Sequence, residues 1–149
     1  MTPVLLALLF FATSGEPAKD PAAEGLIQAG LRFPGTHVCE SQRHPLFMSL
    51  ARQGAQMQAQ QCCCGHPGFD GRFQQALGSG LCGSCSEIAA ESWPWQAHDS
   101  MDSLGWEMFH CWQQSPGHWQ TASTRHRWFG AAMAQGRNGI WYACIIVGD

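Results

Sequence analysis

The sequence predicts a fold of the α+β class, in which helices cover a small β-sheet. Two observations predict the helices: apolar and small residues recur at helical spacing over residues 44–60 and again over 101–114. A third observation predicts the sheet, because two strand-like segments flank an Asn-Gly pair near the C-terminus. The 149 residues are the length of one ordinary domain.

The first helix is expected from about His44 to Gln60. Pro45 suits its first turn, where a missing N–H removes no hydrogen bond. The helix carries a stripe of apolar and small residues, namely Leu46, Leu50, Ala51, Ala55, Met57 and Ala59. The second helix is expected from about Met101 to Gln114, with one buried face formed by Leu104, Met108, Cys111 and Trp112. Ser115-Pro116-Gly117 is expected to end it, because proline cannot continue a helix.

The C-terminal segment is expected to form a β-hairpin. Trp128–Ala134 is the first strand, Arg137-Asn138-Gly139 is the turn, and Ile140–Val147 is the second strand. The second strand is apolar on both faces, which is typical of a central, covered strand. Between the helices, residues 62–83 are rich in glycine and are expected to form a loop that owes its order to cross-links.

The N-terminus predicts export. Pro3–Ala12 is an apolar run, shorter than the about 20 residues that span a bilayer, and small residues follow it. We therefore expect residues 1–18 to be a signal peptide, 19–35 an exposed lead-in and 36–149 the folded domain, in an extracellular or periplasmic protein without a transmembrane segment. Within the lead-in, Gly25 to Phe33 is expected to be a brief helix or coil. A buried N-terminal helix is the alternative.

Composition excludes two classes of protein. Hydrophobic residues make up 45% of the chain and charged residues 13%, which is far from a disordered composition. The net charge is −3 and no basic run is present, so nucleic-acid binding is not expected.

Eight cysteines fit an exported chain, in which an even number is first interpreted as disulfides with open pairing: Cys39, Cys62, Cys63, Cys64, Cys82, Cys85, Cys111 and Cys144. Cys111 and Cys144 would pair if the second helix packed on the hairpin. The alternatives are free core thiols, or zinc thiolates from residues 62–64 and the Cys82-x-x-Cys85 pair.

Three short stretches stand out in order: Cys64-Gly65-His66-Pro67, Cys85-Ser86-Glu87-Ile88-Ala89 and Trp112-Gln113-Gln114-Ser115-Pro116-Gly117-His118. With the alanine-bearing helix before them and the hairpin after them, they resemble the bacterial, secreted branch of the CAP superfamily (cysteine-rich secretory, antigen 5 and pathogenesis-related 1 proteins). The resemblance covers roughly His44 to Val147.

This resemblance implies an α-β-α sandwich with a cleft that holds two histidines and two acidic residues. His66, Glu87 and His118 match three of these positions, and Ser115 accompanies them. The fourth position lacks its glutamate: Gln114 is the positional match and Glu107 a possible substitute.

Two neutral imidazoles, from His66 and His118, are nitrogen donors suited to Zn²⁺ or another divalent metal. With only two protein ligands such a site is weak, unless Glu107 supplies a third. Glu87 or Glu107 would then be the catalytic base of a hydrolase. The alternatives are structural: histidines that bond backbone carbonyls, and a Glu87 that caps the start of a helix.

Three functions follow from these residues. The first is a binding module whose cleft holds a metal or small ligand and whose surface meets an extracellular protein or a lipid. The second is a metal-assisted hydrolase that uses His66, His118 and Glu87 or Glu107. The third is a disulfide-stabilised structural protein without a working cleft. The incomplete fourth position favours the binding module over the enzyme.

Overall fold

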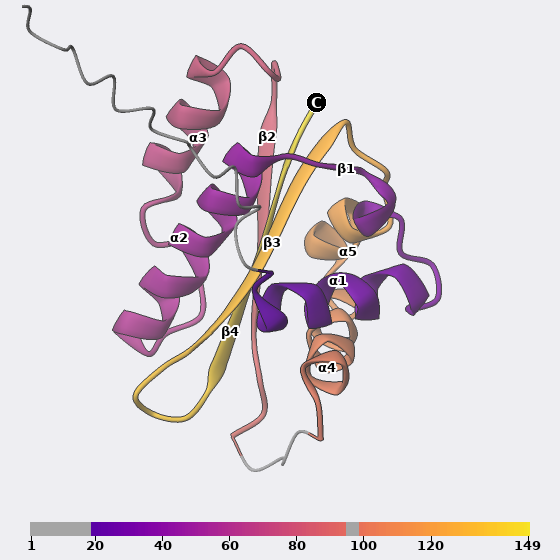
Figure 1. Ribbon diagram of the computed structural model, residues 1–149, viewed down its shortest axis with the longest axis vertical. Coiled ribbons are helices and arrows are strands. Elements are labelled where there is room, and N and C mark those ends of the chain that lie inside the picture. The colour runs from indigo at the N-terminus through magenta and orange to yellow at the C-terminus, as the bar shows by residue number, and fades with distance from the viewer. Residues whose placement is uncertain (1–18, 95–98) are drawn as a thin grey trace, which may run out of the picture.

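The structure is a computed structural model that describes residues 19–94 and 99–149 (Figure 1). Its elements follow in the order α1 (Pro21–Arg32), η1 (Val38–Glu40), β1 (Gln42–Arg43), α2 (Pro45–Gln61), α3 (Phe69–Gly78), β2 (Cys85–Glu91), α4 (Met101–Gln113), α5 (Pro116–Ala122), β3 (Trp128–Gln135) and β4 (Trp141–Gly148). The fold is of the α+β class, as predicted. The signal peptide predicted for residues 1–18 lies outside the described residues.

The sheet has the strand order β1-β3-β4-β2. Strands β3 and β4 form the expected antiparallel hairpin, paired from Gln135 opposite Trp141 to Trp128 opposite Gly148. Strand β2 pairs antiparallel with the other side of β4, and the two-residue β1 pairs parallel with β3. Strand β4 is therefore central, as its apolar sequence predicted, and β2 forms one edge of the sheet.

Helices cover both faces of the sheet, so the architecture is an α-β-α sandwich (Figure 1). Side chains alternate along β4: Ile145 and Val147 join a core with α1, α4 and α5, whereas Cys144 and Ile146 join a second core with α2 and α3. This alternation is the two-residue period of a strand, applied to a strand whose two faces are both buried.

Helix α1 corrects the prediction of an exposed lead-in at residues 19–35. The Asp20 carboxylate caps the helix and accepts the Ala22 N–H at 3.0 Å. Leu26 and Ala29 are buried against α4 and the sheet. Polar residues at both ends obscured this apolar face in the sequence, and the helix begins at Pro21.

Two further helices differ from the predictions. Helix α3 lies inside the segment expected to be a loop; it begins after Gly68, whose φ of 69° suits glycine, and it buries Arg72 and Ala76. Helix α5 begins at Pro116, so Ser115-Pro116 ends one helix and starts the next. Glycine content and proline position are weak signals here, because packing against the sheet decides both helices.

Among the described residues, no helix is long and apolar enough to cross a membrane.

Helix α2 packs tightly against β3 at Gly130. A Cβ atom on Gly130 would lie 2.0 Å from the carbonyl carbon of Phe47, which is backbone and has no rotamer with which to move aside. Only glycine therefore permits this approach between the helix and the sheet.

We predict that Gly130→Ala destabilises the domain by about 1–3 kcal/mol or more, because the α2 backbone must move away from the sheet. Gly71→Ala is the matched control: it lies in α3 and its added Cβ would meet no atom within 4 Å. Urea denaturation of both variants measures the difference. Equal stabilities would contradict the close packing at Gly130.

Candidate functional site

The site is built around a buried ion pair between Arg72 of α3 and Glu87 of β2. The Arg72 side chain is 1% exposed and that of Glu87 is 0% exposed. Arg72 donates from Nε to Glu87 Oε2 at 2.7 Å and from Nη2 to Oε1 at 2.8 Å. Its Nη1 donates to the carbonyl of Pro67 at 2.8 Å. This bidentate geometry compensates the buried carboxylate charge and ties α3, β2 and the preceding loop together.

Glu87 also holds His66. The Nδ1 atom of His66 lies 3.0 Å from Glu87 Oε1, and the His66 side chain is 40% exposed. An ionised carboxylate only accepts hydrogen bonds, so Nδ1 carries the proton and the lone pair of the neutral ring lies on Nε2. Glu87 therefore fixes both the orientation and the tautomer of a partly exposed imidazole.

His118 brings a second imidazole from α5. Its ring centroid lies 5.9 Å from that of His66, with 54° between the ring planes. Burial, and then the charge of the nearby His66, lower the pKa of His118 below its usual value. At neutral pH the His118 ring is therefore neutral and has a lone pair to offer.

The two histidines meet at the outer edge of β2 because the helical layers reach that edge from opposite faces. Residues 62–68 join α2 to α3 on one side, and α4 with α5 lies on the other. Trp112 of α4 donates from its indole N–H to the carbonyl of Ala89 at 2.9 Å and fixes α4 along the strand. The edge strand thus aligns His66 with His118.

The remaining predicted site residues occupy helix ends or the interior. Gln114 is exposed and forms the C-cap of α4, while Ser115 is at the N-cap position of α5 without a side-chain capping bond. Glu107 is buried, and its carboxylate accepts the backbone N–H of Trp93, beyond the far end of β2.

Glu107 therefore does not complete the site. Glu87 and Glu91 are roughly 13 Å apart at the usual rise of a strand, and Trp93 lies further still. The helix-cap alternative for Glu87 is also wrong, because Glu87 lies within strand β2.

The donor set fits a divalent ion only through the two imidazoles. Within residues 19–94 and 99–149, no group of three His, Cys, Asp or Glu side chains is arranged to hold a metal. Glu87 is engaged by Arg72 and His66, so it orients the His66 ring and is not itself one of these donors. The ring separation of 5.9 Å is compatible with a shared ion, since Zn–N bonds of about 2.0 Å place two ring centres roughly 5–6.5 Å apart.

Sequence reasoning missed Arg72. The signal was present, because Arg72 is the sole Lys or Arg between Arg52 and Arg125. A lone cation inside a glycine-rich and cysteine-rich segment indicates a specific carboxylate partner more than a solvated surface. The sequence did not name that partner, because α3 itself was not expected.

The described cysteines are all free thiols. Cys144 faces the core under α2, whereas Cys111 packs against the core on the α4 side, so the sheet separates them and the conditional Cys111–Cys144 pair does not form. Burial raises the pKa of Cys39 to about 12 and that of Cys144 well above its ordinary value. Both behave as core side chains.

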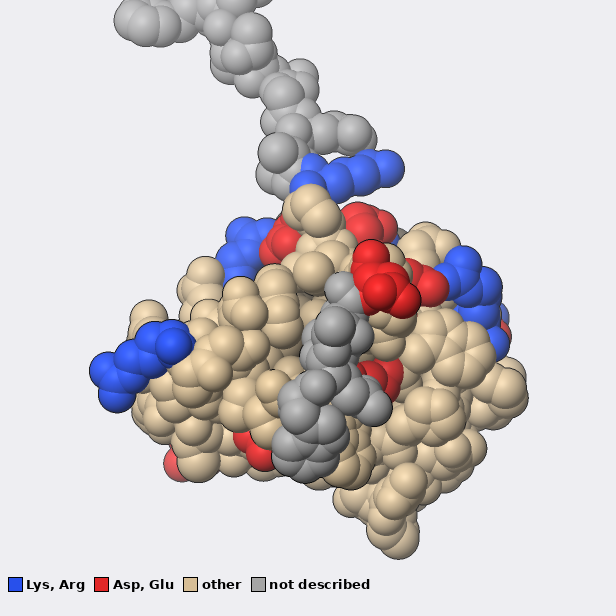
Figure 2. Space-filling model, turned by 90° about the horizontal axis from the view of Figure 1, so that it is seen from below, with Lys and Arg blue, Asp and Glu red and all other residues tan. Residues whose placement is uncertain are grey.

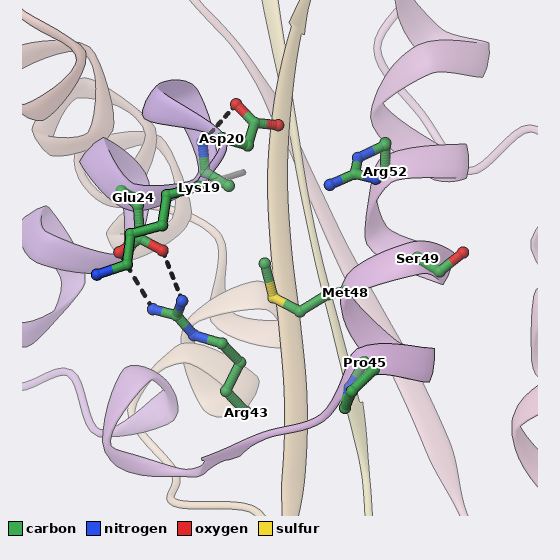
Figure 3. A pocket seen from close by; sticks show the side chains of 9 residues that line it. Lys19, Asp20, Glu24, Arg43, Pro45, Met48, Ser49 and Arg52 are labelled. Carbon is green, nitrogen blue, oxygen red and sulfur yellow. Dashed lines mark hydrogen bonds and ion pairs between the residues drawn. The ribbon is translucent and has the colours of Figure 1, made fainter. Parts of the chain in front are cut away.

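A hollow of about 360 Å³ lies away from the histidines, between the start of α1, β1 and α2 (Figure 3). Glu24 and Arg43 face each other in it and are joined at 2.5 and 3.3 Å; this hydrogen bonding lowers the pKa of Glu24. On the face shown in Figure 2, Lys and Arg lie in separate places near the rim, with acidic side chains among them.

No family model matches the chain. No curated protein matches its sequence either. The resemblance to the CAP superfamily therefore remains an expectation from the motifs.

We predict that Arg72→Met destabilises the domain by about 3–5 kcal/mol, because it leaves the Glu87 charge buried without its main partner. Arg72→Met combined with Glu87→Gln is expected to recover part of this loss, since the buried charge is then gone. Urea denaturation at pH 7 measures both. A loss below about 1 kcal/mol in the single variant would contradict a buried, charged pair.

We predict that the His118 imidazole titrates below the usual histidine value of about 6.5. The unfolded chain then takes up this proton at higher pH than the folded chain, so the stability that His118 contributes is complete above about pH 6.5 and is lost as the pH falls toward the folded pKa. Histidine-resolved NMR titration measures the midpoint. His66→Gln should raise it only partly, because burial is the larger cause.

Proposed function

We propose that this chain is an exported, CAP-like domain that acts as a binding module, with His66 and His118 as the protein ligands of a weakly bound divalent metal ion such as Zn²⁺. The observation that carries the proposal is a pair of adjacent, partly exposed imidazoles, one of which is oriented by a buried carboxylate. An imidazole held by a carboxylate through its other nitrogen is the usual arrangement of a metal-binding histidine.

Weak binding follows from the number of ligands. Two imidazoles leave at least two positions of a tetrahedral ion for water or for a group from a partner. A carboxylate, imidazole or phosphate from an extracellular protein, a lipid headgroup or a small molecule fits such positions. The module would in this way bind its partner through the metal, and chelation would release both.

The resemblance to the CAP superfamily supports the same proposal. It implies three layers, a C-terminal hairpin and a site shared between two histidines and a glutamate. The arrangement of α2, the central hairpin and the three residues agrees with what the resemblance implies. The sequence departs from the family pattern at the fourth position, where Gln114 stands.

The other two functions are less well supported. A metal-assisted hydrolase requires a third ligand or a free base beside the histidines, and the described residues place neither Glu87 nor Glu107 in that role. A purely structural protein would have His66 and His118 far apart or fully buried, whereas their rings are neighbours.

We predict that the purified chain binds one Zn²⁺ at pH 7.5 and that His66→Ala and His118→Ala each abolish this binding. Isothermal titration calorimetry measures this zinc binding. The chain is first reduced and its thiols are alkylated, so that cysteines do not bind the ion. Glu87→Gln should weaken binding 10–100-fold, because the carboxylate that orients His66 loses its charge.

His110→Ala is the matched control, because His110 is an exposed histidine on α4 outside the site. Binding that persists in both site variants, or that is lost equally in the control, would place the metal elsewhere. Absence of binding in the unmodified chain would refute the metal-dependent module.

A further inference from the structure

Two cysteines flank the same edge strand as the two histidines, one on each helical layer. Cys111 belongs to α4, and its Sγ lies 3.9 Å from the carbonyl oxygen of Glu91 in β2. The neighbouring Trp112 is fixed to Ala89 by its indole N–H. The Cys111 thiol therefore has a defined place beside the last residues of β2.

Cys64 reaches the same level of the strand from the other layer. The Gly65 N–H donates to Gln58 Oε1 at 3.2 Å, and Gln58 Nε2 donates to the carbonyl of Ala143 at 3.1 Å. Ala143 is paired with Ala90 of β2. Gln58 thus anchors the residue after Cys64 at Ala143 of β4, opposite Ala90 and one register position from Glu91.

The segment that carries Cys64 is fixed at two points. Gly65 donates to Gln58, and His66 Nδ1 lies 3.0 Å from Glu87 Oε1 in β2. Cys64 and Cys111 therefore both belong to segments held beside strand β2, one on each helical layer.

We propose that Cys64 and Cys111 form a disulfide that joins the α2–α3 layer to the α4–α5 layer across the edge of β2. Such a bond is a covalent counterpart of the His66–His118 contact: His66 follows Cys64 by two residues, and His118 follows Cys111 by seven. The bond holds both histidine-bearing segments against the same strand. This inference concerns the cysteines alone and does not depend on metal binding.

The chemistry is ordinary thiol–disulfide exchange. The thiolate of one cysteine attacks a small-molecule disulfide such as oxidised glutathione and releases one glutathione thiolate. The second cysteine, as thiolate, then attacks the mixed disulfide and releases the second glutathione. In total two protein S–H bonds and one glutathione S–S bond are replaced by one protein S–S bond and two glutathione thiols.

The test is disulfide mapping of the purified chain after equilibration in a glutathione redox buffer. Free thiols are alkylated first, and the chain is then cleaved after Lys, Arg and Glu. Cleavage gives one peptide with Cys64, residues 53–72, and another with Cys111, residues 108–125. Both are separate from peptide 73–87. Mass spectrometry is expected to find 53–72 joined to 108–125. The bond should also raise the thermal midpoint by several degrees relative to Cys64→Ser.

Matched variants identify the sulfur atoms. Cys62→Ser combined with Cys63→Ser should retain the cross-linked peptide pair, whereas Cys64→Ser or Cys111→Ser should abolish it. Full alkylation of both cysteines, a bond from Cys111 to peptide 73–87, or a cross-link that survives Cys64→Ser would each overturn the proposal. The readout is a peptide mass, so it does not depend on any activity of the protein.

Discussion

The Glu87 carboxylate has no solvent exposure. It is stable in this fold because the almost fully buried guanidinium of Arg72 donates two hydrogen bonds to it. An unpaired charge in this position would cost several kcal/mol, so a buried Glu87 carboxylate is stable only when it is paired with Arg72. Helix α3 positions Arg72 for this pairing. The same guanidinium also holds the carbonyl of Pro67. The pair therefore orders the segment between α2 and β2, which has few apolar side chains with which to order itself.

The geometry of His66 is a consequence of this pair. Glu87 has one oxygen shared between Arg72 and His66, so the ring is aligned by a carboxylate that cannot move. A fixed second layer of this kind is what allows an exposed imidazole to present one nitrogen in a constant direction. Without Arg72, the Glu87 carboxylate would bind water or other partners, and the orientation of the His66 ring would no longer be fixed.

Strand β2 lies at the edge of the sheet, and helix α4 covers part of that edge. An edge strand presents unpaired backbone groups that invite association with other chains. Here the Trp112 indole binds the Ala89 carbonyl, and the Cys111 thiol lies against that of Glu91, so α4 covers part of the edge. The same covering brings the helical layers together, which is why His66 and His118 face each other along this one strand.

The sequence by itself determined the elements with strong local signals. The stripe of α2, the face of α4 and the Asn-Gly hairpin each follow from spacing within a few residues, and the unbroken apolar run of β4 predicted its central place in the sheet. The motif order also picked out His66, Glu87 and His118 together. Local signals failed for α3 and the N-terminal α1, where glycine or charged residues obscured a helix that forms because tertiary packing stabilises it.

Only the tertiary structure determined which residues form pairs. Arg72 and Glu87 are separated by 15 residues and His66 and His118 by 52, and no local rule links residues at such distances. It also excluded Glu107, because α4 is aligned on β2 so that this carboxylate binds Trp93 at the opposite end of the strand. Residue types set the available chemistry; the alignment of two helical layers along one strand edge determined which groups meet.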